Sequence, residues 1–88
     1  MLRPKVFTYR GREFKIRATL LEKGWAVQVF ENDRPVSPPY IVTHETAIDF
    51  STAGWGHAVE ALMQTARSDV EEEHLPEVKK LFHPDTPN

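Results

Sequence analysis

Asp49, Ser51 and His57 supply the three residue types of a hydrolase triad within one short stretch of the chain. In a triad the serine attacks, the histidine takes its proton and the carboxylate orients the histidine, so the fold must place all three. A serine nucleophile also needs a sharp turn such as G-x-S-x-G, which the residues around Ser51 lack. A hydroxyl residue just before an apolar repeat is typical of a helix N-cap. We therefore expect Ser51 to cap a helix and predict no catalytic residue and no enzyme.

The four histidines, at positions 44, 57, 74 and 83, are the candidate metal ligands. His44 lies beside Glu45 and close to Asp49, but the chain has no H-E-x-x-H motif. It also has no cysteine, so no Cys/His zinc pattern can form. Isolated histidines of this kind are typical of a solvated surface. The sequence therefore predicts no metal and no other cofactor.

Residues 51–57, S-T-A-G-W-G-H, contain two glycines before an apolar repeat, a place where an anion could meet a helix N-terminus. The segment lacks the lysine and the spacing of a P-loop, and it is not G-x-G-x-x-G. The favoured alternative is structural. The glycines would let the chain turn tightly from sheet to helix, while Trp55 closes the edge of the core.

One long helix is predicted from Ser51 to Glu73, with Ser51 or Thr52 as its N-cap. Apolar residues recur there at steps of three and four and share one face: Trp55, Val59, Leu62, Ala66 and Val70. Because Gly54 and Gly56 weaken the first turn, the regular helix is expected to begin near Trp55. The acidic run at its C-terminal end opposes the helix dipole, which favours fraying there or a role for the acidity.

Four strands are predicted before this helix, and they span Lys5–Tyr9, Glu13–Leu21, Trp25–Phe30 and Tyr40–Thr43. Gly11, at the first central position of a two-residue loop, suits a type II′ turn. A second two-residue loop at Lys23-Gly24 would place Val27 and Val29 opposite Leu20 and Ala18, on the core face. A three-residue loop with a bulge would instead bury Gln28, and we exclude it on that ground.

Two segments leave alternatives open. Residues 44–50 continue the alternation of the fourth strand, a short edge strand, but a short helical turn is the other interpretation. After the acidic run, Pro76–Phe82 suits a short helix with proline at its first position. Residues 83–88 are expected to form a disordered tail, so the predicted domain is a single one over residues 1–82.

The fold class that follows is α+β: an antiparallel meander of three to four strands, one long helix on one face, and a short C-terminal helix. Residues of matching parity define the predicted core: Phe7, Tyr9, Phe14, Ile16, Ala18, Leu20, Val27, Val29, Trp55, Val59, Leu62 and Ala66. The other face of the sheet, here called the outer face, has no covering helix in this plan. That uncovered face is where binding is expected.

The outer face mixes cations with apolar groups, which suits two kinds of partner. Protein contact, including self-association as a homodimer, is predicted through a contiguous apolar patch of Leu21, Ala26 and Phe30. Nucleic acid is the alternative, with phosphates bound by basic residues and a base stacked on Phe30; the candidates are Arg10, Arg12, Lys15, Arg17 and Phe30. A solvated face with scattered apolar residues is the simplest interpretation.

The C-terminal segment offers a second protein contact, through Leu75, Val78, Leu81 and Phe82. It could dock on a partner or fold back over the outer face. Folding back would cover Phe30 and Leu21 and bring the acidic run near Lys15 and Arg17. That arrangement would also balance the charge, because residues 1–23 carry a net +5 and residues 24–88 a net −7.

The chain of 88 residues has no apolar run long enough for a membrane helix, and it contains no cysteine. Its first residues lack a continuous apolar segment, so we expect no secretory leader. These features favour a cytoplasmic protein. The leading hypothesis is a small non-enzymatic binding or adaptor domain that acts through protein contacts. Nucleic-acid binding is the runner-up, and the role and partner stay open.

Overall fold

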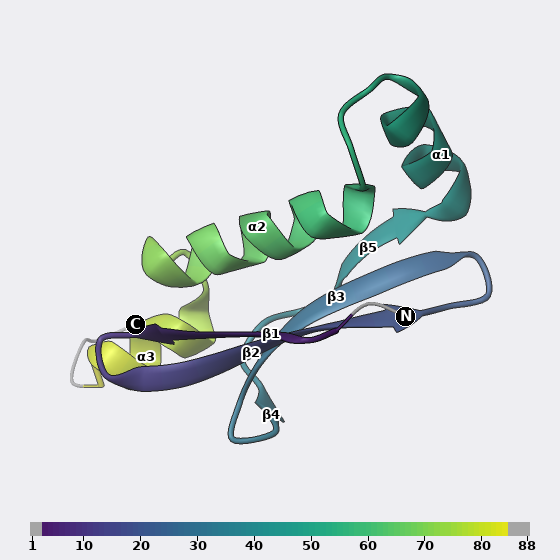
Figure 1. Ribbon diagram of the computed structural model, residues 1–88. Helices are drawn as coiled ribbons and strands as arrows, with labels where there is room; N and C mark the ends of the chain where they lie inside the picture. The colour runs from purple at the N-terminus through teal and green to yellow at the C-terminus, as the bar shows by residue number, and fades with distance from the viewer. Residues whose placement is uncertain (1–2, 85–88) are drawn as a thin grey trace.

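The computed structural model describes residues 3–84 and confirms the α+β class (Figure 1). Five antiparallel strands form one sheet in which β1 (Lys5–Tyr9), β2 (Arg12–Leu20) and β3 (Gly24–Glu31) make the meander. The far side of β3 pairs with β4 (Arg34–Pro35) near one end and with β5 (Tyr40–Thr43) near the other. The helices are α1 (His44–Thr52), α2 (Ala58–Glu71) and α3 (Pro76–Phe82).

The β1–β2 turn is formed by Arg10 and Gly11, which have φ angles of 51° and 78°. Tyr9 lies opposite Arg12 and Phe7 opposite Phe14. Positive φ at both central residues is the type I′ pattern, so the predicted type II′ turn with Gly11 in first position is wrong. The loop still has two residues. For that reason Phe7, Tyr9 and Phe14 keep their predicted inner face.

The β2–β3 turn shows the same kind of shift. The Leu21 N–H donates to the Gly24 carbonyl over 2.7 Å, and Ala18 lies opposite Val27. The two-residue loop is therefore residues 22–23 and not the predicted Lys23-Gly24, so the register moves by two residues. A shift of two preserves side-chain direction. Val27 and Val29 are fully buried, as predicted.

Ser37 holds the irregular link between β4 and β5 against the middle of β3. Its side chain is buried, and its Oγ accepts the Val29 N–H over 3.0 Å and donates to the Pro38 carbonyl over 2.9 Å. The Val36 N–H donates to the Val29 carbonyl over 2.9 Å. The N–H and C=O of Val29, which do not pair with β4 or β5, thus form their hydrogen bonds with this link.

Residues 44–52 form α1, which settles the open alternative in favour of a helix. Thr43 caps it, because its Oγ1 accepts the Thr46 N–H over 3.1 Å. Ser51 and Thr52 end this helix instead of beginning the next one, so the predicted helix from Ser51 to Glu73 is wrong over its first turns. Gly54 and Gly56 have φ angles of 83° and 87°, and such residues cannot continue a right-handed helix.

The helix α2 begins at Ala58 with His57 as its N-cap, whose Nδ1 accepts the Val59 N–H over 3.2 Å. Trp55 precedes this start, and its side chain is 70% exposed. Its ring packs edge-on against Phe50 with centroids 5.4 Å apart. The prediction that Trp55 belongs to the core is therefore wrong, because the glycine-containing loop carries it away from the sheet.

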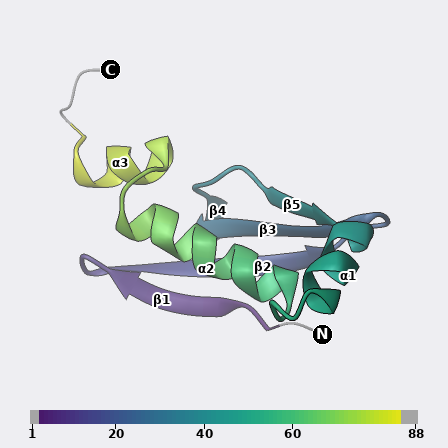
Figure 2. The same cartoon turned by 90° about the horizontal axis from the view of Figure 1, so that it is seen from above.

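From Ala58 onward α2 crosses the inner face of the sheet diagonally (Figure 2). It buries five residues in the core: Ala58, Val59, Met63, Ala66 and Val70. The predicted strand residues lie beneath it, with Phe14 and Ile16 almost fully buried. Leu20 is the exception, 62% exposed at the end of β2. The Tyr40 hydroxyl donates to Asp69 over 2.6 Å and ties β5 to α2, and burial raises the pKa of that hydroxyl.

The predicted C-terminal helix is present as α3, and it folds onto the inner face at the end that carries the β1–β2 turn (Figures 1 and 2). Leu75 and Val78 join the core, and the Phe82 ring meets the Tyr9 ring edge-on at 5.4 Å. The alternative in which this segment covers the outer face is not adopted. Of the predicted tail, residues 85–88 lie outside the described residues.

None of the helices within residues 3–84 combines the length and the apolar character needed to cross a bilayer.

Candidate protein-contact surface

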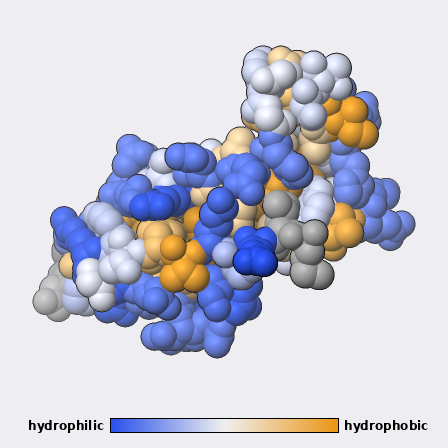
Figure 3. Space-filling view, in the orientation of Figure 1, coloured by the Kyte–Doolittle hydropathy of each residue, from blue (hydrophilic) through white to orange (hydrophobic). Residues whose placement is uncertain are grey.

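Exposed hydrophobic side chains gather at the end of the molecule formed by the β2–β3 turn, β5 and α1. Six large hydrophobic residues of the described chain are exposed, and five of them belong to this end: Leu20, Leu21, Ile41, Ile48 and Trp55. Figure 3 shows hydrophobic surface on α1 and on the end of the sheet beneath it. We call these five residues the apolar end.

Part of the apolar end lies on the outer face of the sheet. Thr19 pairs with Ala26, and Ala26 pairs in turn with Ile41 on the neighbouring strand. Leu21 follows at the β2–β3 turn and is 39% exposed. Leu21 and Ala26 were predicted from the sequence. Ile41 was not among the residues predicted for the outer face. It lies between Tyr40 and Val42, which point to the inner face, so the alternation of the strand could have placed it on the outer face.

Phe30 does not belong to this patch, contrary to the contiguous patch expected from the sequence. It pairs with Lys15 four residues beyond Ala26, which is about 13 Å along the strand. Gln28 and Arg17 lie between the two apolar groups. The Arg17 guanidinium also stacks over the Phe30 ring, 4.6 Å from its centroid. Phe30 is therefore separated from Ala26 and partly covered.

The other part of the apolar end lies on the inner side, beside a groove of about 460 Å³ between β3, α1 and the start of α2. The groove is lined by Trp25, His44, Ala47, Ile48, Ser51, Gly56, His57 and Ala58. Ile48 is 64% exposed at its rim. Within residues 3–84 no three His, Cys, Asp or Glu side chains lie together in a group that could hold a metal ion.

The C-terminal candidates are used for internal packing. Leu75 and Val78 are buried, with Val78 fully enclosed. Leu81 and Phe82 are partly buried against the same core. The Arg10 guanidinium lies 5.6 Å from the centroid of the Phe82 ring and covers it further. These four residues hold α3 on the domain, and Leu75 and Val78 present almost no surface to solvent.

The cations proposed for nucleic acid are divided between surfaces. Lys15 and Arg17 lie on the outer face, and Arg17 pairs with Asp33 over 2.7 Å. Arg12 lies on the inner side opposite Tyr9, and its Nε and Nη2 donate to the two carboxylate oxygens of Glu31. The sequence analysis assigned these cations to one basic surface, because the acidic residue that pairs with each cation cannot be predicted from the sequence.

Arg10, at the β1–β2 turn, belongs to a small charged cluster around Glu73. Its Nη1 lies 3.3 Å from Glu73 Oε2, the Tyr9 hydroxyl donates to the same oxygen over 2.8 Å, and His83 Nε2 lies 2.7 Å from Oε1. The hydrogen bond from Tyr9, followed by that from His83, lowers the pKa of the Glu73 carboxyl. The acidic run therefore tethers the C-terminal helix to the hairpin.

This cluster predicts a pH dependence of stability. The pKa of Glu73 is lower in the folded than in the unfolded chain, so its contribution is present above the ordinary value of 4.5 and is lost as the pH falls through the folded value. Acidification from about pH 7 to about pH 3 should therefore lower the thermal midpoint less in Glu73→Gln than in the wild type. Glu72→Gln, an exposed neighbour, is the control and should follow the wild type. Equal acid sensitivity of all three proteins would contradict the proposed role.

Comparison of the chain with protein-family models, curated proteins and solved structures finds no match in any of the three.

Proposed function

We propose that this protein is a small non-enzymatic binding domain that acts through protein contacts, and that it associates with a second copy of itself through the apolar end. The observation that carries the proposal is the gathering of five of the six exposed large hydrophobic residues at this end. Isolated apolar residues on a surface are normal, but a cluster of them is typical of an interface.

A second copy is the partner favoured by the outer part of this surface. The row Thr19, Ala26 and Ile41, with Leu21 beside it, contains no charged side chain. In a two-fold dimer the same patch faces itself, so like charges at its centre would repel and a neutral centre is required. Two sheets can pack face to face at about 10 Å with small and branched residues between them.

The test is the oligomeric state of wild type and of Ile41→Lys by sedimentation equilibrium. We expect a reversible dimer for the wild type and at least about a tenfold weaker association for the variant, since a lysine would place two like charges at the axis. Ile41 is 62% exposed, so the variant should keep its fold.

Val6→Lys is the matched control, because Val6 is the exposed large hydrophobic residue away from this end and is 54% exposed. It should dimerise like the wild type. A wild-type protein that stays monomeric at about 0.5 mM, or equal effects of the two substitutions, would overturn the self-association.

Nucleic-acid binding stays the second hypothesis, with Lys15 and Arg17 as its remaining support on the outer face. It predicts salt-dependent binding that weakens in Arg17→Glu. The absence of any shift of DNA or RNA at low salt would end it. A cytoplasmic location, favoured by the lack of cysteine, belongs to the same proposal.

A further inference from the structure

The strand β5 is a free edge of the sheet. It pairs with β3 on one side, and within residues 3–84 no other strand pairs with it. Figure 2 shows β5 at the border of the sheet, on the far side of β3 from β2. Because an edge strand presents unpaired backbone groups, it can join a strand of another chain.

The backbone groups of Ile41 and Thr43 point away from β3. The His44 N–H donates to the Lys23 carbonyl over 3.0 Å, so His44 is a residue whose backbone bonds towards β3. In an antiparallel ladder, the residues that bond to a given neighbour alternate along the strand. Val42 therefore bonds to β3, whereas the N–H and C=O groups of Ile41 and Thr43 are directed to the open side.

The ladder between β2 and β3 supports the same assignment. The Leu21 N–H donates to the Gly24 carbonyl over 2.7 Å, so the even-numbered residues of β3 bond to β2 and the odd-numbered ones to the other side. Trp25, an odd-numbered residue, is the partner of Val42. Thr43 is extended, with a φ of −74° and a ψ of 157°, so the open row of backbone groups continues to the end of the strand.

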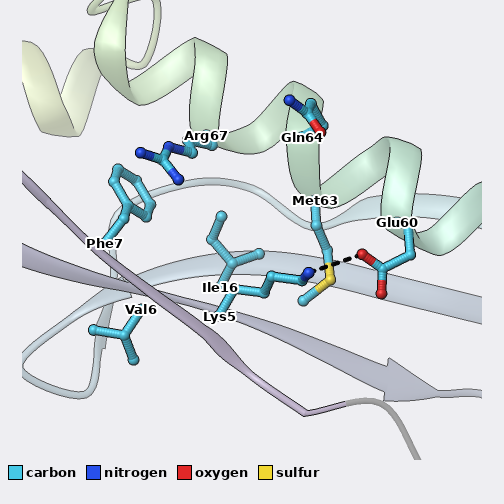
Figure 4. A pocket seen from close by; sticks show the side chains of 8 residues that line it. All are labelled: Lys5, Val6, Phe7, Ile16, Glu60, Met63, Gln64 and Arg67. Atoms are coloured by element: carbon cyan, nitrogen blue, oxygen red, sulfur yellow. Dashed lines mark ion pairs between the residues drawn. The ribbon is translucent and has the colours of Figure 1, made fainter.

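The edge at β5 carries no charged side chain, since the strand reads Tyr-Ile-Val-Thr. The opposite edge, β1, is different. There Lys5 Nζ lies 3.0 Å from Glu60 Oε2, and the Arg67 guanidinium lies 4.9 Å from the centroid of the Phe7 ring (Figure 4). Charged side chains along an edge strand oppose pairing with a further strand. Of the two edges, β5 is therefore the one suited to pairing.

Two neutral rows of side chains lead across the outer face to this edge. One row is Thr19, Ala26 and Ile41, and the next row is Leu21, Gly24 and Thr43. Beyond the first row Arg17 pairs with Gln28, so the neutral area is narrow along the strands. It reaches the border of the sheet at β5, where a second sheet could extend it.

We propose that two copies of this protein join edge to edge along β5, with Val42 of each copy at the two-fold axis, so that the two sheets become one. This arrangement rests on the proposed self-association and specifies its geometry. Ile41 of one copy lies opposite Thr43 of the partner subunit. Each such pair exchanges two hydrogen bonds between backbone groups that point outward in the single copy.

The register about Val42 makes the edge complementary to itself, as a two-fold contact requires. The neutral row that ends at Ile41 continues into the row that begins at Thr43 of the partner subunit, and the reverse holds across the axis. A register centred on Ile41 would instead place Thr43 opposite Pro39, which has no N–H to donate. A second copy of β5 therefore matches both the backbone groups and the neutral surface.

Face-to-face packing of the outer faces is the other arrangement open to the apolar end. It would leave the outward groups of Ile41 and Thr43 bonded to water. Amide hydrogen exchange of the wild type, below and above the dimerisation midpoint found by sedimentation, separates the two arrangements. We expect the Ile41 and Thr43 amides to exchange at least about tenfold more slowly in the dimer, and the Val42 amide to be protected in both states.

Ile41→Pro is the matching variant, because it removes an outward N–H and no bond to β3. It should weaken dimerisation at least about tenfold and leave the fold of the dilute monomer unchanged. The control is Ile41→Val, which keeps the N–H and a branched apolar side chain. Its dimerisation should stay within about threefold of the wild type.

Two results would overturn the edge pairing and leave the self-association standing. One is a dimer whose Ile41 and Thr43 amides exchange as fast as in the monomer, and the other is equal dimerisation of Ile41→Pro and Ile41→Val. A wild type that stays monomeric at about 0.5 mM would overturn both proposals. Since the exchange measurement uses the wild type, it decides the question even if Ile41→Pro does not fold.

Discussion

Phe14→Ala is expected to reduce the free energy of unfolding by about 4 kcal/mol. Phe14 is fully buried at the centre of the inner face, and its ring stacks on Phe7 with centroids 5.6 Å apart. The substitution removes most of a large apolar side chain and leaves a cavity that the sheet and α2 cannot close. A small domain has a total stability of about 5–15 kcal/mol, so a large share of it would be lost.

Chemical denaturation with equal slopes for variant and wild type measures this effect. Trp55→Ala is the matched control, because it also removes a large aromatic ring but one that is 70% exposed. Its cost should stay below about 1.5 kcal/mol, the order of its edge-on contact with Phe50. Similar losses for the two substitutions would show that Trp55 is part of the core after all.

Gly24→Ala is expected to cost about 3 kcal/mol, because the start of β3 lies directly against β5. An alanine Cβ at this position would fall 2.8 Å from the Thr43 Cα and closer still to the Val42 carbonyl oxygen. Backbone atoms on a paired strand cannot rotate away. The strand β5 must therefore shift, and α1, whose cap is Thr43, would shift with it.

Gly11→Ala separates this steric effect from the general cost of replacing a glycine. A Cβ there meets no atom within 4 Å, but its φ of 78° disfavours alanine. We expect a loss of about 1 kcal/mol from that conformation alone. Thermal unfolding should place Gly24→Ala at least about 8 °C below Gly11→Ala. Equal midpoint temperatures for the two variants would mean that β5 can shift to accommodate the alanine without a loss of stability.

The inner face of the sheet could be predicted because strand alternation has a period of two. Both turns are one residue away from their predicted positions, yet Phe14, Val27 and Val29 are buried as expected. A two-residue loop placed one position earlier changes the pairing by two residues, and such a change restores every side chain to the same face. An error of one residue in the position of a turn therefore changes the strand register but not the predicted fold class.

The helical region was harder to predict, because one apolar repeat spans two separate helices. Trp55 lies in phase with Val59 and Leu62, so spacing alone continued the helix across Gly54 and Gly56. The left-handed φ of both glycines breaks the chain there. His57 then serves as N-cap with a ring nitrogen, a role that sequence patterns assign more readily to Ser51.

Four features could be predicted from the amino-acid sequence: the α+β class, the inner face of the meander, the short C-terminal helix and the lack of a recognised catalytic or metal-binding motif. These follow from local periodicity, turn residues and residue types, which act over a few positions. Three features required the tertiary structure: α3 folds onto the inner face, Arg12 and Lys15 point to opposite faces with Arg12 paired to Glu31, and the exposed apolar residues meet at one end. Those outcomes depend on contacts between residues far apart in the chain, such as Tyr9 with Glu73 and Ala26 with Ile41, which no local pattern specifies.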